Sequence, residues 1–242
     1  MTEDANKLIF AVKENKLGMG EVVFCWQPGN KILAFCGENR VVNIVDRLGT
    51  KIVDFPLNFG GKCKYLEFDN EESDTLAVLQ DGCSIVTVIN IFTRSVLDLE
   101  INKANKDKPT CIKWGINHSI LAIGTHKGLL YYYNKKKEKI TPIPTTHSKA
   151  IICADWNDEG NLVTGDENRS LCVISKTGEL LLKNAIMKAE PKMLKWARQK
   201  TNDIKAGFST ISIIQNNKTI LFHPFSLKTF HNCIRCYHLC SS

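Results

Sequence analysis

The stretch ICADWNDEGNLVTGDENRSLCVISKTGELLLK, residues 152–183, decides the fold of this chain. Short apolar runs alternate in it with polar turns, and the first run ends in Trp156. The turns contain Gly160 and Gly178 beside Asn and Thr, which are residue types of tight turns. Runs of this length and composition are typical of β-strands, so the stretch predicts one small sheet of strands joined by turns.

The same pattern of apolar runs and polar turns occurs in four other places along the chain. Its copies cover residues 22–55, 65–99 and 111–143, and a fifth copy begins at residue 193 and resumes at residues 209–225. The aromatic residue that ends the first run recurs at intervals of 42, 46, 42 and 40 residues. In the five copies it is Trp26, Phe68, Trp114, Trp156 and Trp196.

Two further landmarks share this period. An apolar residue followed by a small one marks the second run, and a polar residue ends the third run. The polar residue is Asp46, Asn90, Asn134 and Ser175 in the first four copies. A period of about 40–45 residues with four short strands per unit is typical of WD-repeat blades. The sequence therefore predicts an all-β fold, a WD-repeat β-propeller.

The repeats define one predicted domain, residues 8–225, between an N-terminus (1–7) and a Cys-rich tail (226–242) that are both predicted to be disordered. The predicted blades lie near residues 22–60, 61–105, 108–146, 147–186 and 190–225. WD-repeat rings commonly contain about seven blades. Residues 8–12, LIFAV, have the composition of an outer strand with which an N-terminus latches such a ring. We therefore expect an incomplete propeller of about five blades, from which the closing blades are missing.

The composition indicates a globular protein that binds no nucleic acid and does not span a membrane. About 43% of the residues are hydrophobic, and the net charge of +7 comes without a dense basic stripe interleaved with aromatics. The longest apolar stretch, residues 84–92, falls far short of the ~20 residues that a membrane helix needs. Because residues 1–6 lack a secretory pattern, we expect a cytoplasmic protein with reduced cysteines. Those in apolar runs are predicted to be buried core residues: Cys25, Cys36, Cys153 and Cys172.

One polar constellation has the residue types of a hydrogen-bonded network. His147 precedes the fourth copy, Thr164 lies in its second run and Asp166 lies in the following turn. We predict that these three side chains hold the turn, and we predict no nucleophile triad because no strained Ser elbow accompanies them. The acidic residues at 69–74 and 158–159 are predicted to be solvated blade corners.

The tail contains a cluster of zinc-ligand types, namely Cys233, Cys236, His238 and Cys240. Zinc sites usually separate two ligand pairs by a longer loop, so this spacing makes a cramped cage, and we predict no metal site. The sequence predicts no cofactor and no catalytic residue, since it contains no Gly-rich phosphate loop followed by a helix. Residues 135–137 and Lys139 form a basic turn, interpreted as a solvated face, with acidic lipid headgroups or tubulin tails as the alternative contact.

Three longer segments of the chain are distinctive: VVNIVDRLGTK at 41–51, SILAIGTHKGLLYYYN at 119–134 and ICADWNDEGNLVTGDEN at 152–168. They are similar to the first propeller of the WD repeat-containing protein 19 family, large subunits of intraflagellar transport complex A. Shorter matching pieces lie at 9–10, 17–18, 24–30 and 217–222. The motifs DR-x-G-x-K and GT-x-KG-x-L are more specific than the residues that WD repeats share in general. The resemblance covers roughly residues 8–225.

The resemblance implies a non-enzymatic scaffold whose partners are proteins, in particular other complex A subunits. It also implies a place at the ciliary base and axoneme, and a role in retrograde transport, cilium assembly and admission of membrane-protein cargo to the cilium. Peripheral contact with membrane cargo would occur in the full complex. Two alternatives stay open: a WD-repeat adaptor of another complex, such as a vesicle coat or a ubiquitin ligase, and a propeller hydrolase with ligands converging at a channel mouth.

Overall fold

The computed structural model describes residues 8–101, 107–187, 189–196, 209–215 and 218–225. The chain divides into a first unit, residues 1–106, and a second unit, residues 107–242. Strands make up nearly all of the regular structure in both units. Each unit is described by itself below.

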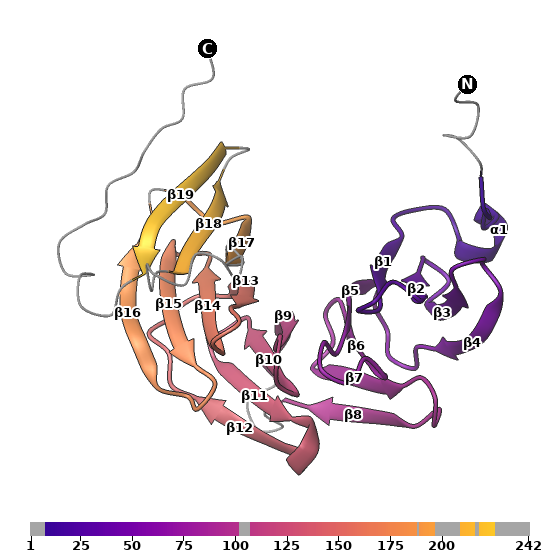
Figure 1. Cartoon of the computed structure of the whole chain (residues 1–242), viewed down its shortest axis with the longest axis horizontal. Coiled ribbons are helices and arrows are strands. Elements are labelled where there is room, and N and C mark those ends of the chain that lie inside the picture. Colours follow the sequence, from indigo (N-terminus) through magenta and orange to yellow (C-terminus); the bar gives the residue numbers. More distant parts are fainter. Residues whose placement is uncertain (1–7, 102–106, 188, 197–208, 216–217, 226–242) are drawn as a thin grey trace. The chain divides into compact units, whose positions relative to one another are not determined.

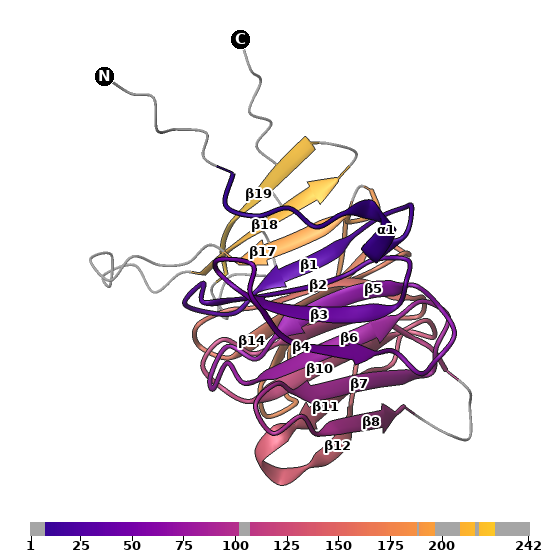
Figure 2. The same cartoon turned by 90° about the vertical axis from the view of Figure 1, so that its right-hand side faces the viewer.

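The first unit contains two four-stranded antiparallel sheets and one short helix, α1 (Glu14–Leu17). Sheet 1 is formed by β1 (Val23–Trp26), β2 (Ile32–Cys36), β3 (Val41–Asp46) and β4 (Lys51–Pro56). Sheet 2 is formed by β5 (Cys63–Phe68), β6 (Thr75–Gln80), β7 (Ile85–Asn90) and β8 (Val96–Glu100). Consecutive strands lie side by side in each sheet, as Figure 2 shows for β5 to β8.

The second unit repeats this arrangement. Sheet 3 is formed by β9 (Pro109–Trp114), β10 (Ile120–Thr125), β11 (Leu130–Asn134) and β12 (Lys139–Ile143), with a 3₁₀ turn, η1 (Lys135–Lys137), before β12. Sheet 4 is formed by β13 (Ile151–Trp156), β14 (Asn161–Asp166), β15 (Ser170–Ser175) and β16 (Leu180–Ile186). Sheet 5 has three strands, β17 (Met193–Trp196), β18 (Ser209–Gln215) and β19 (Lys218–Phe225) (Figure 1).

These sheets confirm the predicted all-β fold built from WD-repeat blades. The described residues form four four-stranded sheets and one three-stranded sheet, and blades that would close a ring are not among them. Residues 193–196 form a strand, as the repeat predicts, because Met193 to Trp196 pair with β18 in antiparallel register. The pairing register places the aromatic landmark at the end of each sheet's first strand.

Within each unit, neighbouring sheets bury apolar side chains against each other. One core in the first unit combines residues from sheets 1 and 2, including Ala34, Ile44, Phe68 and Leu76. In the second unit, sheets 3 and 4 share one core and sheets 4 and 5 share another. Apolar burial on both faces of a sheet is the main source of stability for stacked blades, and it explains why β6 is buried throughout its length.

The polar residue at the end of each third strand closes the turn that follows. Asp46 Oδ1 accepts hydrogen bonds from the backbone N–H groups of Leu48 and Thr50, both at 2.8 Å. The N–H of Thr50, with those of Leu48 and Gly49, lowers the pKa of Asp46 below its usual value. Corresponding bonds in the other sheets are made by Asn90 to Thr93, Asn134 to Lys137 and Ser175 to Glu179. Asx- and ST-type turns therefore bond the backbone N–H groups between the third and fourth strands, where the ladder of strand hydrogen bonds is interrupted.

Residues 8–12 do not form the predicted latching strand; this expectation was wrong. The described chain is irregular from residue 8 to α1, and its Phe10 and Leu17 pack against Phe35 and Val45 of sheet 1. Backbone bonding reinforces the contact, because the N–H of Asn39 donates to the carbonyl of Leu17 at 3.0 Å. Phe10 and Leu17 thus cover part of one face of sheet 1, and the segment adds no strand to the described sheets.

Two other expectations concern the solvated corners and the tail. Asp69 was expected to be solvated, but it is completely buried, and its Oδ1 accepts a hydrogen bond from the N–H of Glu71 at 3.0 Å. The tail with Cys233, Cys236, His238 and Cys240 lies outside the described residues. Within the described ranges, no helix has the length and apolar character that crossing a membrane requires.

Candidate functional site

The aromatic landmarks differ in burial according to their sheet. Trp114 and Trp156 are completely buried, and Phe68 and Trp196 are nearly so, at 2% and 6% exposure. Trp26 on β1 is 42% exposed, and Phe24 on the same strand is 64% exposed. Because alternate residues of a strand share a face, Phe24 and Trp26 point to the same side of sheet 1. The sequence repeat did not distinguish this exposed tryptophan from the buried ones.

Each buried tryptophan of sheets 4 and 5 ties its sheet to the preceding one. The indole Nε1 of Trp156 donates to the carbonyl of Lys113 at 3.1 Å, and that of Trp196 donates to the carbonyl of Asp155 at 3.0 Å. In both cases the acceptor is the residue just before the preceding landmark. The landmark therefore contributes a directed inter-sheet hydrogen bond as well as apolar area.

Asp155 is a second link between the first strands of three sheets. Its Oδ2 accepts a hydrogen bond from the backbone N–H of Trp196 at 2.9 Å, and its Oδ1 lies 3.3 Å from Lys195 Nζ and 3.9 Å from Lys113 Nζ. Sequence reasoning missed this residue. A signal was present, because the position before the landmark carries Lys113, Asp155 and Lys195 in consecutive copies, charges of alternating sign.

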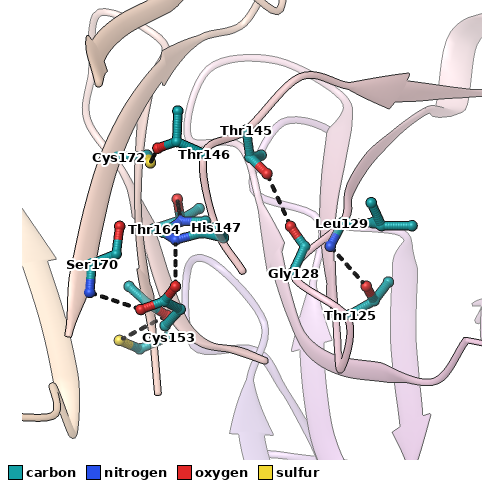
Figure 3. A network of polar contacts seen from close by, with 12 residues as sticks. Thr125, Gly128, Leu129, Thr145, Thr146, His147, Cys153, Thr164, Ser170 and Cys172 are labelled. Atoms are coloured by element: carbon teal, nitrogen blue, oxygen red, sulfur yellow. Dashed lines mark hydrogen bonds and ion pairs between the residues drawn. The ribbon is translucent and has the colours of Figure 1, made fainter. Parts of the chain in front are cut away.

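The structure brings His147, Thr164 and Asp166 together in the second unit. Figure 3 shows His147 beside Thr164. His147 Nε2 lies 2.7 Å from Thr164 Oγ1, and its Nδ1 lies 3.1 Å from Asp166 Oδ2. Asp166 Oδ1 also accepts the backbone N–H of Ser170 at 2.7 Å, at the start of β15. The network joins the loop before sheet 4 to β14 and to the turn that leads into β15, so it holds three consecutive segments in place.

Cys172 lies beside this network. Its sulfur is 2.9 Å from the hydroxyl of Thr146. The imidazole of His147 is close enough to influence the ionisation of this thiol. Burial opposes ionisation of the thiol, but the interaction with His147 outweighs it and lowers the pKa of Cys172 to about 7. Burial likewise opposes the charged form of His147, yet the sulfur of Cys172 and the carboxylate of Asp166 together raise its pKa.

Thr164, His147 and Asp166 are connected in the same order as the residues of a hydrolytic triad. Unlike the residues of such a triad, they are not accessible to a substrate. The side chains of His147 and Asp166 are 0% exposed, and Thr164 is also completely buried. A catalytic hydroxyl must meet its substrate at hydrogen-bonding range, which such burial prevents. The arrangement suits a structural role in which buried polar groups satisfy one another.

An acidic cluster lies in the turn between β5 and β6. Carboxylate oxygens of Asp69, Glu72 and Asp74 all approach within 4.8 Å of one another, a grouping that can hold a cation. Asp74 is also bonded within the protein, since it accepts from Thr75 at 2.8 Å and from the side-chain amide of Asn90 at 2.7 Å. These bonds fix the turn against the end of β7.

The basic turn follows a strand of buried tyrosines. Residues 135–137 form η1, which Asn134 caps by accepting the N–H of Lys137 at 3.0 Å. Tyr131, Tyr132 and Tyr133 are all buried within β11, and burial raises the pKa of Tyr132. The lysines therefore share no surface with an aromatic cluster.

Apolar side chains are exposed at corresponding turns of the first unit. Leu48, between β3 and β4, is 72% exposed, and Phe92, between β7 and β8, is 65% exposed. In an antiparallel meander these turns lie at the same end of their sheets, opposite the turn between the second and third strands. Sequence reasoning did not select these two residues, because a single apolar residue in a turn carries no periodic signal.

Comparison with known proteins identifies the relatives of the chain. The family model for the first β-propeller of WDR19 matches residues 22–234. WD repeat-containing protein 19 of Mus musculus is 30% identical over 220 residues, and that of Homo sapiens is 29% identical over 218 residues. These alignments cover 90% and 89% of this chain but 16% of each relative.

Proposed function

Because the chain belongs to the family of the WD repeat-containing protein 19 first β-propeller, we propose that it is a protein-interaction scaffold of the ciliary transport machinery. Its proposed partners are other subunits of intraflagellar transport complex A. The proposed roles are retrograde ciliary transport, cilium assembly and admission of membrane-protein cargo to the cilium. The proposed locations are the cytoplasm, the ciliary base and the axoneme. The proposed activity is binding without catalysis.

The exposed apolar residues at corresponding turns support this proposal most directly. Leu48 and Phe92 are the most exposed large apolar side chains in the turns between third and fourth strands of sheets 1 and 2. Blade turns on a rigid sheet scaffold are suited to binding, and exposed large apolar side chains mark protein contacts when several share one surface. Polar groups with catalytic potential, such as His147 and Asp155, are instead engaged in contacts between sheets and turns.

The test is recovery of complex A subunits with the tagged chain from ciliated cells, measured by quantitative mass spectrometry. The double variant Leu48→Glu and Phe92→Glu is expected to lower recovery at least about tenfold, since charging an apolar anchor removes more than about 1.4 kcal/mol of binding free energy. Leu129→Glu is the matched control, because Leu129 is 39% exposed in the turn between β10 and β11. Recovery without any complex A subunit from the unsubstituted chain would contradict the proposal.

A further inference from the structure

The first strand of a sheet has two sides, and each side faces a different neighbour. The landmark aromatic packs toward the preceding sheet: Trp156 belongs to the core shared by sheets 3 and 4, and Trp196 to the core shared by sheets 4 and 5. The residue three positions earlier lies on the other side, because side chains alternate along a strand. It packs toward the following sheet, since Cys111 and Cys153 belong to these same two cores. We call the side that carries the landmark the leading face and the other side the trailing face.

The leading face of sheet 1 is exposed at its first strand. Phe24 and Trp26 are 64% and 42% exposed, whereas Leu66 and Phe68, at the corresponding positions of sheet 2, are 7% and 2% exposed. Among the described residues, the indole N–H of Trp26 has no hydrogen-bond partner, unlike those of the landmarks in sheets 4 and 5. This face therefore has the composition of a contact between sheets but is accessible to solvent.

The segment before β1 leaves this part of the leading face open. Its residues Phe10 and Leu17 pack against Phe35 on β2 and Val45 on β3. Neighbouring sheets touch mainly through their first strands, since β1 contacts β5, β9 contacts β13 and β13 contacts β17. A further sheet can therefore dock on β1 without displacing the segment.

Sheet 5 exposes the complementary trailing face. Met193 is 47% exposed, whereas Cys111 and Cys153, its counterparts in sheets 3 and 4, are 3% and 8% exposed. Lys195 precedes the landmark, and in sheets 3 and 4 the backbone carbonyl at this position accepts the indole N–H from the following sheet. The ammonium group of Lys195 lies 3.3 Å from Asp155 Oδ1, so covering this face buries no unpaired charge.

We propose that the leading face of sheet 1 binds the trailing face of sheet 5 in a second copy of this chain. In this contact Phe24 and Trp26 are buried against Met193 of the second copy, and the indole N–H of Trp26 donates to the carbonyl of Lys195 in that copy. The occupant follows from the repeat, because the two faces correspond position by position to those that pack together between sheets 4 and 5. A second copy supplies a face of this chemistry without any other partner.

The contact joins two different faces, so it is heterologous, and each copy carries one face of each kind. Copies therefore associate head to tail, and a copy with one intact face can take part in a single contact. Neither face includes Leu48 or Phe92, the turn residues proposed to bind complex A subunits. Loss of self-association would thus leave that binding intact, and loss of that binding would leave self-association intact.

The test is sedimentation velocity of the purified chain over a concentration series that reaches about 100 μM, within the range of weak dissociation constants. We expect the unsubstituted chain to self-associate as its concentration rises and to return to the monomer on dilution. Trp26→Arg disables the leading face and Met193→Glu the trailing face, so each variant alone should stay monomeric. An equimolar mixture of the two variants should form a one-to-one dimer, because each retains the face that the other lacks.

Val96→Glu is the matched control. Val96 on β8 is 49% exposed, lies in the same unit as Trp26 and belongs to neither face. This variant should self-associate like the unsubstituted chain.

A chain that is monomeric over the whole series would overturn the proposal, and so would a mixture that stays monomeric. Self-association that survives Met193→Glu but not Trp26→Arg would mean that two leading faces pack on each other, which also overturns it. Circular dichroism checks that each variant folds. Hydrogen exchange of the unsubstituted chain needs no variant: protection of β1 and β17 should rise with concentration, while that of β8 stays constant. Exchange at β17 that is independent of concentration would rule out the contact.

Discussion

The indole nitrogen of Trp156 lies 3.1 Å from the backbone carbonyl of Lys113, and this hydrogen bond joins the first strands of two consecutive sheets. Trp196 repeats the relationship with Asp155 one blade later. The rule for sheets 4 and 5 is that the landmark tryptophan donates to the backbone of the preceding blade, whatever side chain stands at the accepting position.

Replacement of Trp156 by Phe should separate the hydrogen bond from the apolar contact. Trp156→Phe keeps an aromatic ring but leaves the carbonyl of Lys113 without its donor and removes buried volume, so we expect a loss of about 2 kcal/mol in unfolding free energy. Urea denaturation followed by circular dichroism measures it. Trp26→Phe is the control, expected to cost less than about 0.5 kcal/mol because Trp26 is 42% exposed. Equal losses in both variants would contradict the rule.

Asp155 should be needed for docking sheet 5 onto sheet 4. Asp155→Ala leaves the buried N–H of Trp196 without its acceptor and both neighbouring lysines without their carboxylate, at an expected cost of about 1–3 kcal/mol. Asp155→Asn retains an oxygen acceptor and should cost less. Hydrogen exchange at Trp196 measures the local effect. Slow exchange that persists in Asp155→Ala would show that the carboxylate is dispensable.

The ion pair of His147 and Asp166 predicts a pH dependence of stability. The pKa of His147 is raised in the folded protein, so its contribution is complete below the unfolded value of about 6.5 and is lost as pH rises through the folded value. The loss in unfolding free energy caused by Asp166→Asn should therefore be larger at pH 6 than at pH 8. NMR titration provides the direct check, because the pKa of His147 should fall in Asp166→Asn. A pKa unchanged by the substitution would rule out the carboxylate as a cause.

Two corresponding turns place different residues at a positive φ, a backbone conformation that favours glycine. Gly128 has a φ of 81°, and a Cβ there would lie 2.8 Å from the carbonyl oxygen of His147, so Gly128→Ala should cost more than about 2 kcal/mol. Arg40 occupies the corresponding turn of sheet 1 with a φ of 57° and is exposed. Arg40→Gly removes the strain of a left-handed Arg and should stabilise by up to about 1 kcal/mol. Thermal denaturation of both variants measures these shifts.

The repeat predicted the sheets because every blade reuses the same local chemistry. Runs that end in Trp114 or Trp156 and turns that begin with Asp46 or Asn134 are specified within a few residues, so periodicity alone located them. Residues 8–12 were mispredicted as a strand, because composition shows β-propensity but not the presence of a partner strand.

Contacts between blades were harder to anticipate. Asp155 accepts from Trp196, which is 41 residues away, and Trp156 donates to Lys113, which is 43 residues away. Such pairs depend on how neighbouring sheets pack, and no short motif encodes that. His147, Thr164 and Asp166 were named from the sequence because their positions within a WD repeat are fixed relative to the landmarks, whereas the involvement of Cys172 follows only from the packing.

The polar residue that ends the third strand of sheets 1 to 4 closes a turn with its own side chain, so each of these four blades carries the means of finishing its outer hairpin. Asp46, Asn90, Asn134 and Ser175 belong to three residue types, yet each bonds to backbone within four residues of itself. A DNA segment that encodes one blade therefore brings this closure with it when it is duplicated. Lineages can gain blades by tandem copying, and the copies can then diverge in their outer loops without losing the hairpin.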